Sequence, residues 1–217
     1  MNKRINRLAT GLAATAAATA TVVSMSATAA QAATSYTPTG GPGANFVGTN
    51  VSFTDIEAGQ TLTCTTFNLS GSIINSGASR AYGVDGGTLG SLTSSGCTNP
   101  LAGPTTVTPV GTWTVAVTGD ASGTSWPARL KNVKATVTAA NCTFGVTGVV
   151  NGRFDDSTQK FTPNAGASGL TIDGGAGAPT GSMCVTLDLQ PGDTVAVGGY
   201  WTNTPPAGST ALDISNP

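Results

Sequence analysis

Histidine is absent from the 217 residues, and charged residues make up only 9% of them. Without histidine the chain cannot form a Ser-His-Asp or Cys-His arrangement, and it lacks the commonest general acid or base near neutral pH. No Gly-rich phosphate-binding loop followed by Lys is present either. Carboxylate chemistry is therefore the main catalytic chemistry that the composition leaves open.

Ligands for a metal ion are also scarce. A zinc site needs closely spaced cysteines or histidines, and the four cysteines of this chain are far apart in the sequence. No loop of alternating acidic residues of the calcium-binding type is present. We therefore expect no metal site and no cofactor.

Basic residues are few beyond residue 32, where six Lys and Arg stand against ten Asp and Glu, a net charge of −4. Nucleic-acid binding needs a clustered excess of positive charge. The densest basic group is Arg129, Lys131 and Lys134, whose spacing is better explained by a strand that carries charges to discourage edge pairing. We expect no nucleic-acid partner.

Residues 1–32 have the pattern of a signal peptide. Lys3, Arg4 and Arg7 precede an Ala- and Thr-rich apolar run at residues 8–23, and small residues follow, which predicts cleavage near residues 29–33. A transmembrane anchor would need about 20 consecutive strongly apolar residues. We therefore expect a secreted protein without a transmembrane anchor, extracellular or associated with the cell wall.

An ordered set of residues occurs twice, in residues 50–113 and 132–201. Self-similarity in a fixed order is typical of a repeated structural unit. The first copy contains Asn50-Val51, Cys64-Thr65, Phe67, Gly71, Leu92-Thr93, Cys97 and Trp113, and the second contains Asn132-Val133, Cys142-Thr143, Phe144, Gly148, Leu170-Thr171, Cys184 and Trp201. The pattern predicts two related halves.

The four cysteines of an exported chain are expected to form disulfides, because the compartment is oxidising. Three connectivities are possible. Since each copy carries two cysteines at corresponding places in the order, the duplication favours two bonds within the halves, Cys64–Cys97 and Cys142–Cys184.

Apolar residues alternate with polar ones between clusters of turn residues, and no helical period is sustained. Residues 142–150 give the clearest strand. An additional Thr between Cys64 and Phe67 predicts a β-bulge near Thr65 or Thr66. We predict an all-β fold, a β-sandwich or barrel built from two related halves. The single domain spans residues 50–203, flanked by a flexible N-terminal segment at 33–49 and a flexible tail at 204–217.

Two carboxylates are candidates for catalysis. Asp55 and Glu57, the only glutamate, stand two residues apart, and as acid and base they would suit a hydrolase acting on extracellular polysaccharide. Asp155 and Asp156 are adjacent, and neighbouring strand residues point to opposite faces. We interpret that pair as turn residues.

Aromatic side chains are the remaining candidates for a binding site. Trp113 and Trp201 occupy corresponding places in the two copies and are expected to pack in the core. Trp126 has no counterpart and precedes Pro127, which predicts an exposed position suited to stacking on a sugar ring or an apolar ligand. Tyr82 and Tyr200 are further candidates for ligand binding.

The region after residue 32 resembles small exported actinobacterial all-β proteins of uncharacterised function, on its Ala- and Thr-rich signal, its two cysteine pairs and residues 142–148. It is also similar in composition to the enediyne-chromophore carrier apoproteins, which are acidic, immunoglobulin-like and carry two disulfides. This chain is longer than those carriers, and their ligand cleft does not map onto it residue by residue. That resemblance implies carriage of an apolar small molecule.

Together these features predict a secreted, non-catalytic β-domain that binds a partner or associates with the cell envelope. The candidate partners are a cell-wall glycan and an apolar small molecule. The alternatives are the carboxylate-dependent hydrolase and a structural or self-assembling surface protein. The sequence leaves open the ligand, the oligomeric state and the choice between sandwich and barrel.

Overall fold

The computed structural model describes residues 33–217, and the predicted signal peptide lies outside the described residues. The described chain is almost entirely β, with one short helix, which confirms the predicted fold class. In chain order the elements are β1 (Ser35–Gly41), β2 (Gly43–Asp55), β3 (Thr61–Ile73), β4 (Arg80–Ala81), β5 (Gly87–Asn99), β6 (Gly103–Pro109), β7 (Trp113–Val117), β8 (Ser125–Ala139), β9 (Cys142–Asp155), β10 (Lys160–Pro163), β11 (Ala167–Ile172), α1 (Ser182–Thr186), β12 (Thr194–Gly198), β13 (Trp201–Asn203) and β14 (Thr210–Ser215).

The main sheet closes on itself as an antiparallel barrel. From β2 the pairing runs through β3 and β5 to β6 and β7, which both pair with β8. From β8 it continues through β9 to β10 and β11, then to β13 and β12, which both pair with β2. Closure leaves no free edge in this sheet and gives it one enclosed face.

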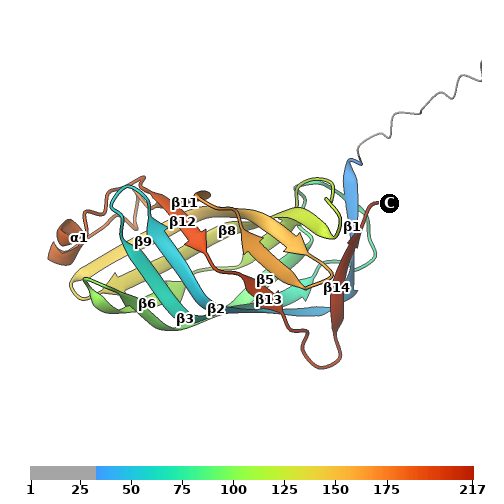
Figure 1. The fold of residues 1–217 in the computed structure, drawn as a ribbon, viewed down its shortest axis with the longest axis horizontal. Coiled ribbons are helices and arrows are strands. Elements are labelled where there is room, and N and C mark those ends of the chain that lie inside the picture. Colours follow the sequence, from blue (N-terminus) through green and yellow to red (C-terminus); the bar gives the residue numbers. More distant parts are fainter. Residues whose placement is uncertain (1–32) are drawn as a thin grey trace, which may run out of the picture. The chain divides into compact units, whose positions relative to one another are not determined.

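The two ends of the barrel are covered differently (Figure 1). The helix α1 lies at one end, and a second sheet of order β14-β1-β4 lies at the other. Residues 33–49 and 204–217 are thus not the flexible segments that their composition predicts. They include β1, which pairs with β14, and the start of β2, which pairs with β3 and β13.

In β2, β3 and β5 the alternation of inward- and outward-facing side chains is interrupted at one level of the barrel. In β3, Cys64 and Phe67 are both buried although they are three positions apart. The residues opposite Thr65 on the neighbouring strands, Asn50 in β2 and Gly96 in β5, have positive φ angles of 53° and 60°. Because β2 and β5 each have a left-handed residue at this level, their alternation shifts at the same place as that of β3.

The predicted β-bulge near Thr65 or Thr66 is wrong. The pairing of β2 with β3 keeps one register throughout, because the neighbouring strand changes phase at the same level. The register shift of β3 lies further along, between Ser70 and Gly71, where it pairs with β5.

Both predicted disulfides are present. Cys64–Cys97 joins directly opposite residues of β3 and β5, whereas Cys142–Cys184 joins the start of β9 to α1. The connectivity is confirmed, but the two bonds do not occupy equivalent places in the fold.

An aromatic layer fills the middle of the barrel. The ring of Phe67 lies 6.1 Å from that of Trp113 and 6.4 Å from that of Trp201, between centroids. The indole Nε1 of Trp201 donates a hydrogen bond of 2.7 Å to the backbone oxygen of Phe67. Both tryptophans are buried, as the sequence predicts.

Candidate functional site

Two cavities lie inside the barrel. The first cavity, of about 70 Å³, is on the α1 side, and the second cavity, of about 60 Å³, is on the side of β1 and β14. Their linings share no residue. Phe67 and Trp113 line the first cavity and Trp201 lines the second, so the aromatic layer separates them.

The first cavity is lined by side chains from both sequence copies, and only four of its twenty lining residues are polar. The alternation of apolar residues along the strands supplies this lining, because every second side chain points inward. The apolar members are Phe53, Leu62, Phe67, Val107, Trp113, Val133, Ala135, Val137, Ala139, Phe144, Val146, Leu170, Ile172, Leu187, Leu189 and Val195.

The segment after α1 contributes one wall of this cavity. Leu187 and Leu189 are buried, line the cavity and pack in one cluster with the disulfide Cys142–Cys184. The backbone N–H of Leu187 donates to the oxygen of Met183, and that of Leu189 donates to the oxygen of Cys184. A disulfide and backbone hydrogen bonds therefore hold this wall in place.

Three of the four polar lining residues have their hydrogen bonds within the protein. The Nδ2 of Asn99 donates to the Thr61 oxygen at 3.1 Å and to Gln60 Oε1 at 3.5 Å, while its Oδ1 accepts from two backbone N–H groups. Thr105 Oγ1 donates to the Gly103 oxygen. These groups shape the cavity wall and have few hydrogen bonds left for a ligand.

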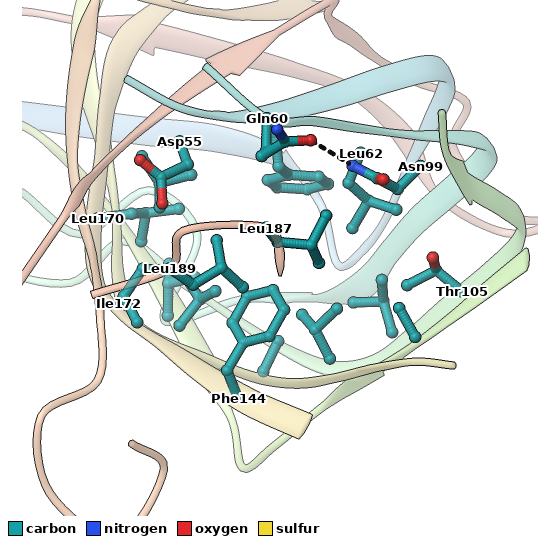
Figure 2. Close-up of a pocket in the computed structure, with 18 of the residues that line it drawn as sticks. Asp55, Gln60, Leu62, Asn99, Thr105, Phe144, Leu170, Ile172, Leu187 and Leu189 are labelled. Atoms are coloured by element: carbon teal, nitrogen blue, oxygen red, sulfur yellow. Dashed lines mark hydrogen bonds between the residues drawn. The ribbon is translucent and has the colours of Figure 1, made fainter. Parts of the chain in front are cut away.

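Asp55 is the exception. It ends β2 with 5% of its surface exposed, and Oδ1 accepts from the backbone N–H of Ala58 at 3.0 Å. Its Oδ2 is buried and has no hydrogen-bond partner among the described residues. Figure 2 shows Asp55 beside Leu170, apart from the linked pair of Gln60 and Asn99. A buried acceptor without a partner costs free energy, which a bound donor would recover.

The surroundings of Asp55 favour its protonated form. Burial raises the pKa of this carboxyl group, the Ala58 N–H lowers it, and the nearby carboxylates of Asp193 and Glu57 raise it further. Burial is the largest of these causes, and Oδ2 forms no hydrogen bond to Asp193. Asp55 therefore lies among groups of its own charge.

Glu57 has the opposite environment. Its side chain is exposed in the turn after β2, and Oε2 accepts a 2.7 Å hydrogen bond from the backbone N–H of Thr194. This bond is the main cause that lowers the pKa of Glu57. The two carboxylates predicted as a pair are thus divided between the inside and the outside of the barrel.

Trp126 does not present an exposed face, so that prediction is wrong. It lies in β8 with 5% of its surface exposed and packs with Tyr36 and Val117. Its Nε1 donates to Asp156 Oδ2 at 3.0 Å. It is buried because Trp126, Ala128 and Leu130 share the inward face of the strand.

The two candidate tyrosines lie in different surroundings. Tyr82 stacks on Tyr36 at 6.1 Å, and its hydroxyl donates to Asp120 Oδ1 at 2.6 Å. Desolvation, followed by the interaction with Asp120, raises the pKa of Tyr82 to about 12. Tyr200 is 49% exposed, with Lys160 Nζ 4.6 Å from its ring centroid. Neither residue lines either cavity.

Asp155 and Asp156 serve the turn after β9. Asp155 accepts from the hydroxyl of Ser157 at 2.7 Å and from the N–H of Thr158 at 2.9 Å. These bonds, that of Ser157 first, lower the pKa of Asp155 to about 2. Asp156 accepts from Trp126, so both residues have structural partners.

Comparisons add no relatives to these observations: no family model, no curated protein and no solved structure matches the chain. Within residues 33–217, no group of three or more Cys, Asp or Glu side chains is placed to hold a metal ion. The one helix in this range is too short to cross a membrane.

The sequence pattern singles out Asp55 but pairs it with Glu57 as a catalytic acid and base. Val51, Phe53 and Asp55 alternate along β2, and this period of two places an acidic residue on the inward face. That pattern was the available indication of a buried carboxylate. The cavity itself depends on the pairing of β12 with β2, far apart in the sequence.

Proposed function

We propose that this chain is an exported, non-catalytic binding domain that holds a small apolar molecule in the first cavity. The observation that carries the proposal is an apolar space inside the barrel with a single buried carboxylate oxygen left without a partner. Ligand sites are typically apolar pockets with a few well-placed polar groups. The two disulfides support a role in an oxidising compartment, outside the cell or at its envelope.

The size of the cavity limits the ligand. Its 70 Å³ is roughly half of an engineered 150 Å³ apolar cavity that binds benzene. A short alkyl chain is therefore the part of a ligand that the space accepts without movement of the wall. A larger ligand would need displacement of Leu187 and Leu189, which follow the helix on an irregular segment.

The predicted duplication is part of this proposal. In the first half β2 pairs with β3, β3 with β5, and β5 with both β6 and β7. In the second half β8 pairs with β9, β9 with both β10 and β11, and these two with β13 and β12 respectively. Asn132 in β8 and Gly169 in β11 have positive φ angles, like Asn50 and Gly96. These correspondences support two related halves that together enclose each cavity.

The test is a pair of cavity-filling variants on one strand. Ala135 and Ala128 both lie in β8, both are buried, and they line the first and second cavity respectively. Isothermal titration calorimetry with 1-pentanol should show binding to the wild type and to Ala128→Phe but not to Ala135→Phe. Each substitution is expected to cost about 1–3 kcal/mol of stability through overpacking, so folding is checked by thermal unfolding.

Equal binding by the two variants would contradict the first cavity as the site. Absence of binding to the wild type by 1-pentanol and by benzene would contradict the proposal as a whole. Binding lost only in Ala128→Phe would move the site to the second cavity.

A hydrolase using Asp55 and Glu57 is the second candidate, because their pKa values shift in opposite directions, as in an acid and base pair. Its substrate would have to reach Asp55 through an apolar space of about 70 Å³, which suits a sugar ring poorly. Release of reducing ends from cell-wall polysaccharide, lost in both Asp55→Asn and Glu57→Gln, would establish this alternative.

A further inference from the structure

We infer that the ligand of the first cavity is a primary amine on a short apolar chain, bound with its ammonium group against Asp55. This inference rests on the proposed function and adds the charge of the ligand to it. It comes from three features of the site: an unpartnered acceptor, an excess of negative charge and the absence of a basic residue from the lining.

The acceptor is Oδ2 of Asp55. An ionised carboxylate only accepts hydrogen bonds, and Oδ1 already has its partner in Ala58. Oδ2 is buried without a partner in a mostly apolar lining, where the one other buried polar atom without a partner is the Nε1 of Trp113, itself a donor. A ligand bound there is complementary if it combines a donor with apolar atoms.

The charge around Asp55 selects the kind of donor. The carboxylates of Asp193 and Glu57 are close enough to raise its pKa, and no Lys or Arg lines the first cavity. Within residues 33–217 the one ion pair joins Lys131 to Asp85, and neither residue lines this cavity. Asp55 therefore has no cation from this range paired with it. Three carboxylates near one another favour a cation over a neutral hydroxyl group and repel an anion.

An ammonium group also fits better than a guanidinium group. It is compact and donates in three directions, whereas a guanidinium group is a planar fork. Asp55 offers one free oxygen in the cavity rather than a free bidentate carboxylate, because Ala58 occupies Oδ1. The alkyl chain would lie toward Leu187, Leu189 and Phe144, which Figure 2 shows in the same space.

The experiment compares three probes of the same chain length at pH 7: n-pentylamine, 1-pentanol and pentanoate. Titration of the wild-type protein should show the amine binding about tenfold tighter than the alcohol or more, as expected of a charge-assisted hydrogen bond. Pentanoate should not bind. In Asp55→Asn the advantage of the amine over the alcohol should disappear, while Asp213→Asn, at an exposed position in β14 outside the first cavity, should keep it.

A second measurement avoids any dependence on the variant. In the wild type, the ¹³C shift of the Asp55 carboxyl carbon is followed against pH with and without each probe. A bound ammonium group should lower the apparent pKa of Asp55, and 1-pentanol should lower it far less.

The outcomes separate this inference from the proposed function. If the alcohol binds in the first cavity and the amine binds no tighter, the inference is overturned and the apolar site stands. If neither probe binds, the proposed function fails and the inference fails with it. An amine advantage that persists in Asp55→Asn, with no shift in the Asp55 titration, would also overturn it.

Discussion

The indole N–H of Trp201 and the backbone oxygen of Phe67 form a 2.7 Å hydrogen bond in the middle of the barrel, where both residues are buried. Trp113 stacks on the same Phe67, yet its Nε1 has no partner within residues 33–217. Two tryptophans at corresponding places in the sequence therefore contribute differently to stability.

Substitution of each tryptophan by Phe should reveal this difference. Both changes remove a similar volume, but Trp201→Phe also leaves the Phe67 oxygen without its donor. We expect Trp201→Phe to lower the free energy of unfolding by about 1–2 kcal/mol more than Trp113→Phe. Urea unfolding followed by circular dichroism measures both. A larger loss in Trp113→Phe would contradict this assignment.

The two disulfides should contribute similarly to stability but differently to binding. They close loops with sequence separations of 33 and 42 residues, so loss of either should cost about 4 kcal/mol by the loop-entropy model. Removal of Cys142–Cys184 by double Ser substitution also releases the wall formed by Leu187. We expect that variant to bind 1-pentanol more weakly.

The matched control is the double Ser variant of Cys64–Cys97, which joins two strands already held by backbone pairing. It should bind 1-pentanol like the wild type under conditions where both variants are folded. Equal weakening in the two variants would show that the segment after α1 has no special role in the site.

Asp55 should make stability decrease with rising pH. The folded protein holds the proton of the Asp55 carboxyl group more tightly than the unfolded chain does. The loss of stability therefore begins above the ordinary aspartate pKa of 3.8 and is complete above the raised pKa of the folded state. Asp55→Asn should match the wild type at low pH and be about 1 kcal/mol more stable at pH 8, since it removes a buried charge.

Chemical unfolding of Asp55→Asn and wild type across this pH range tests that expectation. Asp213→Asn, at an exposed position in β14, serves as the control and should show no such trend. A variant less stable than the wild type at pH 8 would show that the carboxylate stabilises the fold.

Asp155 should have the opposite pH dependence. Its pKa is lowered to about 2, so its stabilisation is fully present above 3.8 and disappears as the pH falls through about 2. Asp155→Ala should therefore melt a few degrees lower at pH 7, and the gap should close toward pH 2. Thermal unfolding at several pH values measures it, and a gap that is constant with pH would contradict the role of the charge.

The local pattern of the strands was predictable from the sequence. Trp113 and Trp201 are inward-facing as expected, and the order of the cysteines gave the correct disulfides although the two bonds occupy different settings. Such predictions succeed because a period of two depends only on neighbouring residues. By contrast, strand β1 depends on pairing with β14, in which Thr37 lies opposite Ser215, and local composition does not encode so distant a partner.

The candidate site was predictable only in its chemistry. The sequence identified Asp55 as a residue of interest, but its burial follows from closure of the barrel through β12 and β2. The following Pro127 and the lack of a counterpart predict an exposed Trp126, but the alternation of Trp126, Ala128 and Leu130 is the stronger indication. Cavities depend on how distant strands meet, so no local pattern gives their volume.

The most direct test of the central claim is to locate 1-pentanol by nuclear Overhauser effects to assigned methyl groups. We expect contacts with Leu187 and Val137, which line the first cavity, and none with Leu212 or Ile214, which line the second. Contacts restricted to exposed methyl groups such as Val185, or no contacts at millimolar probe, would contradict a ligand site inside the barrel.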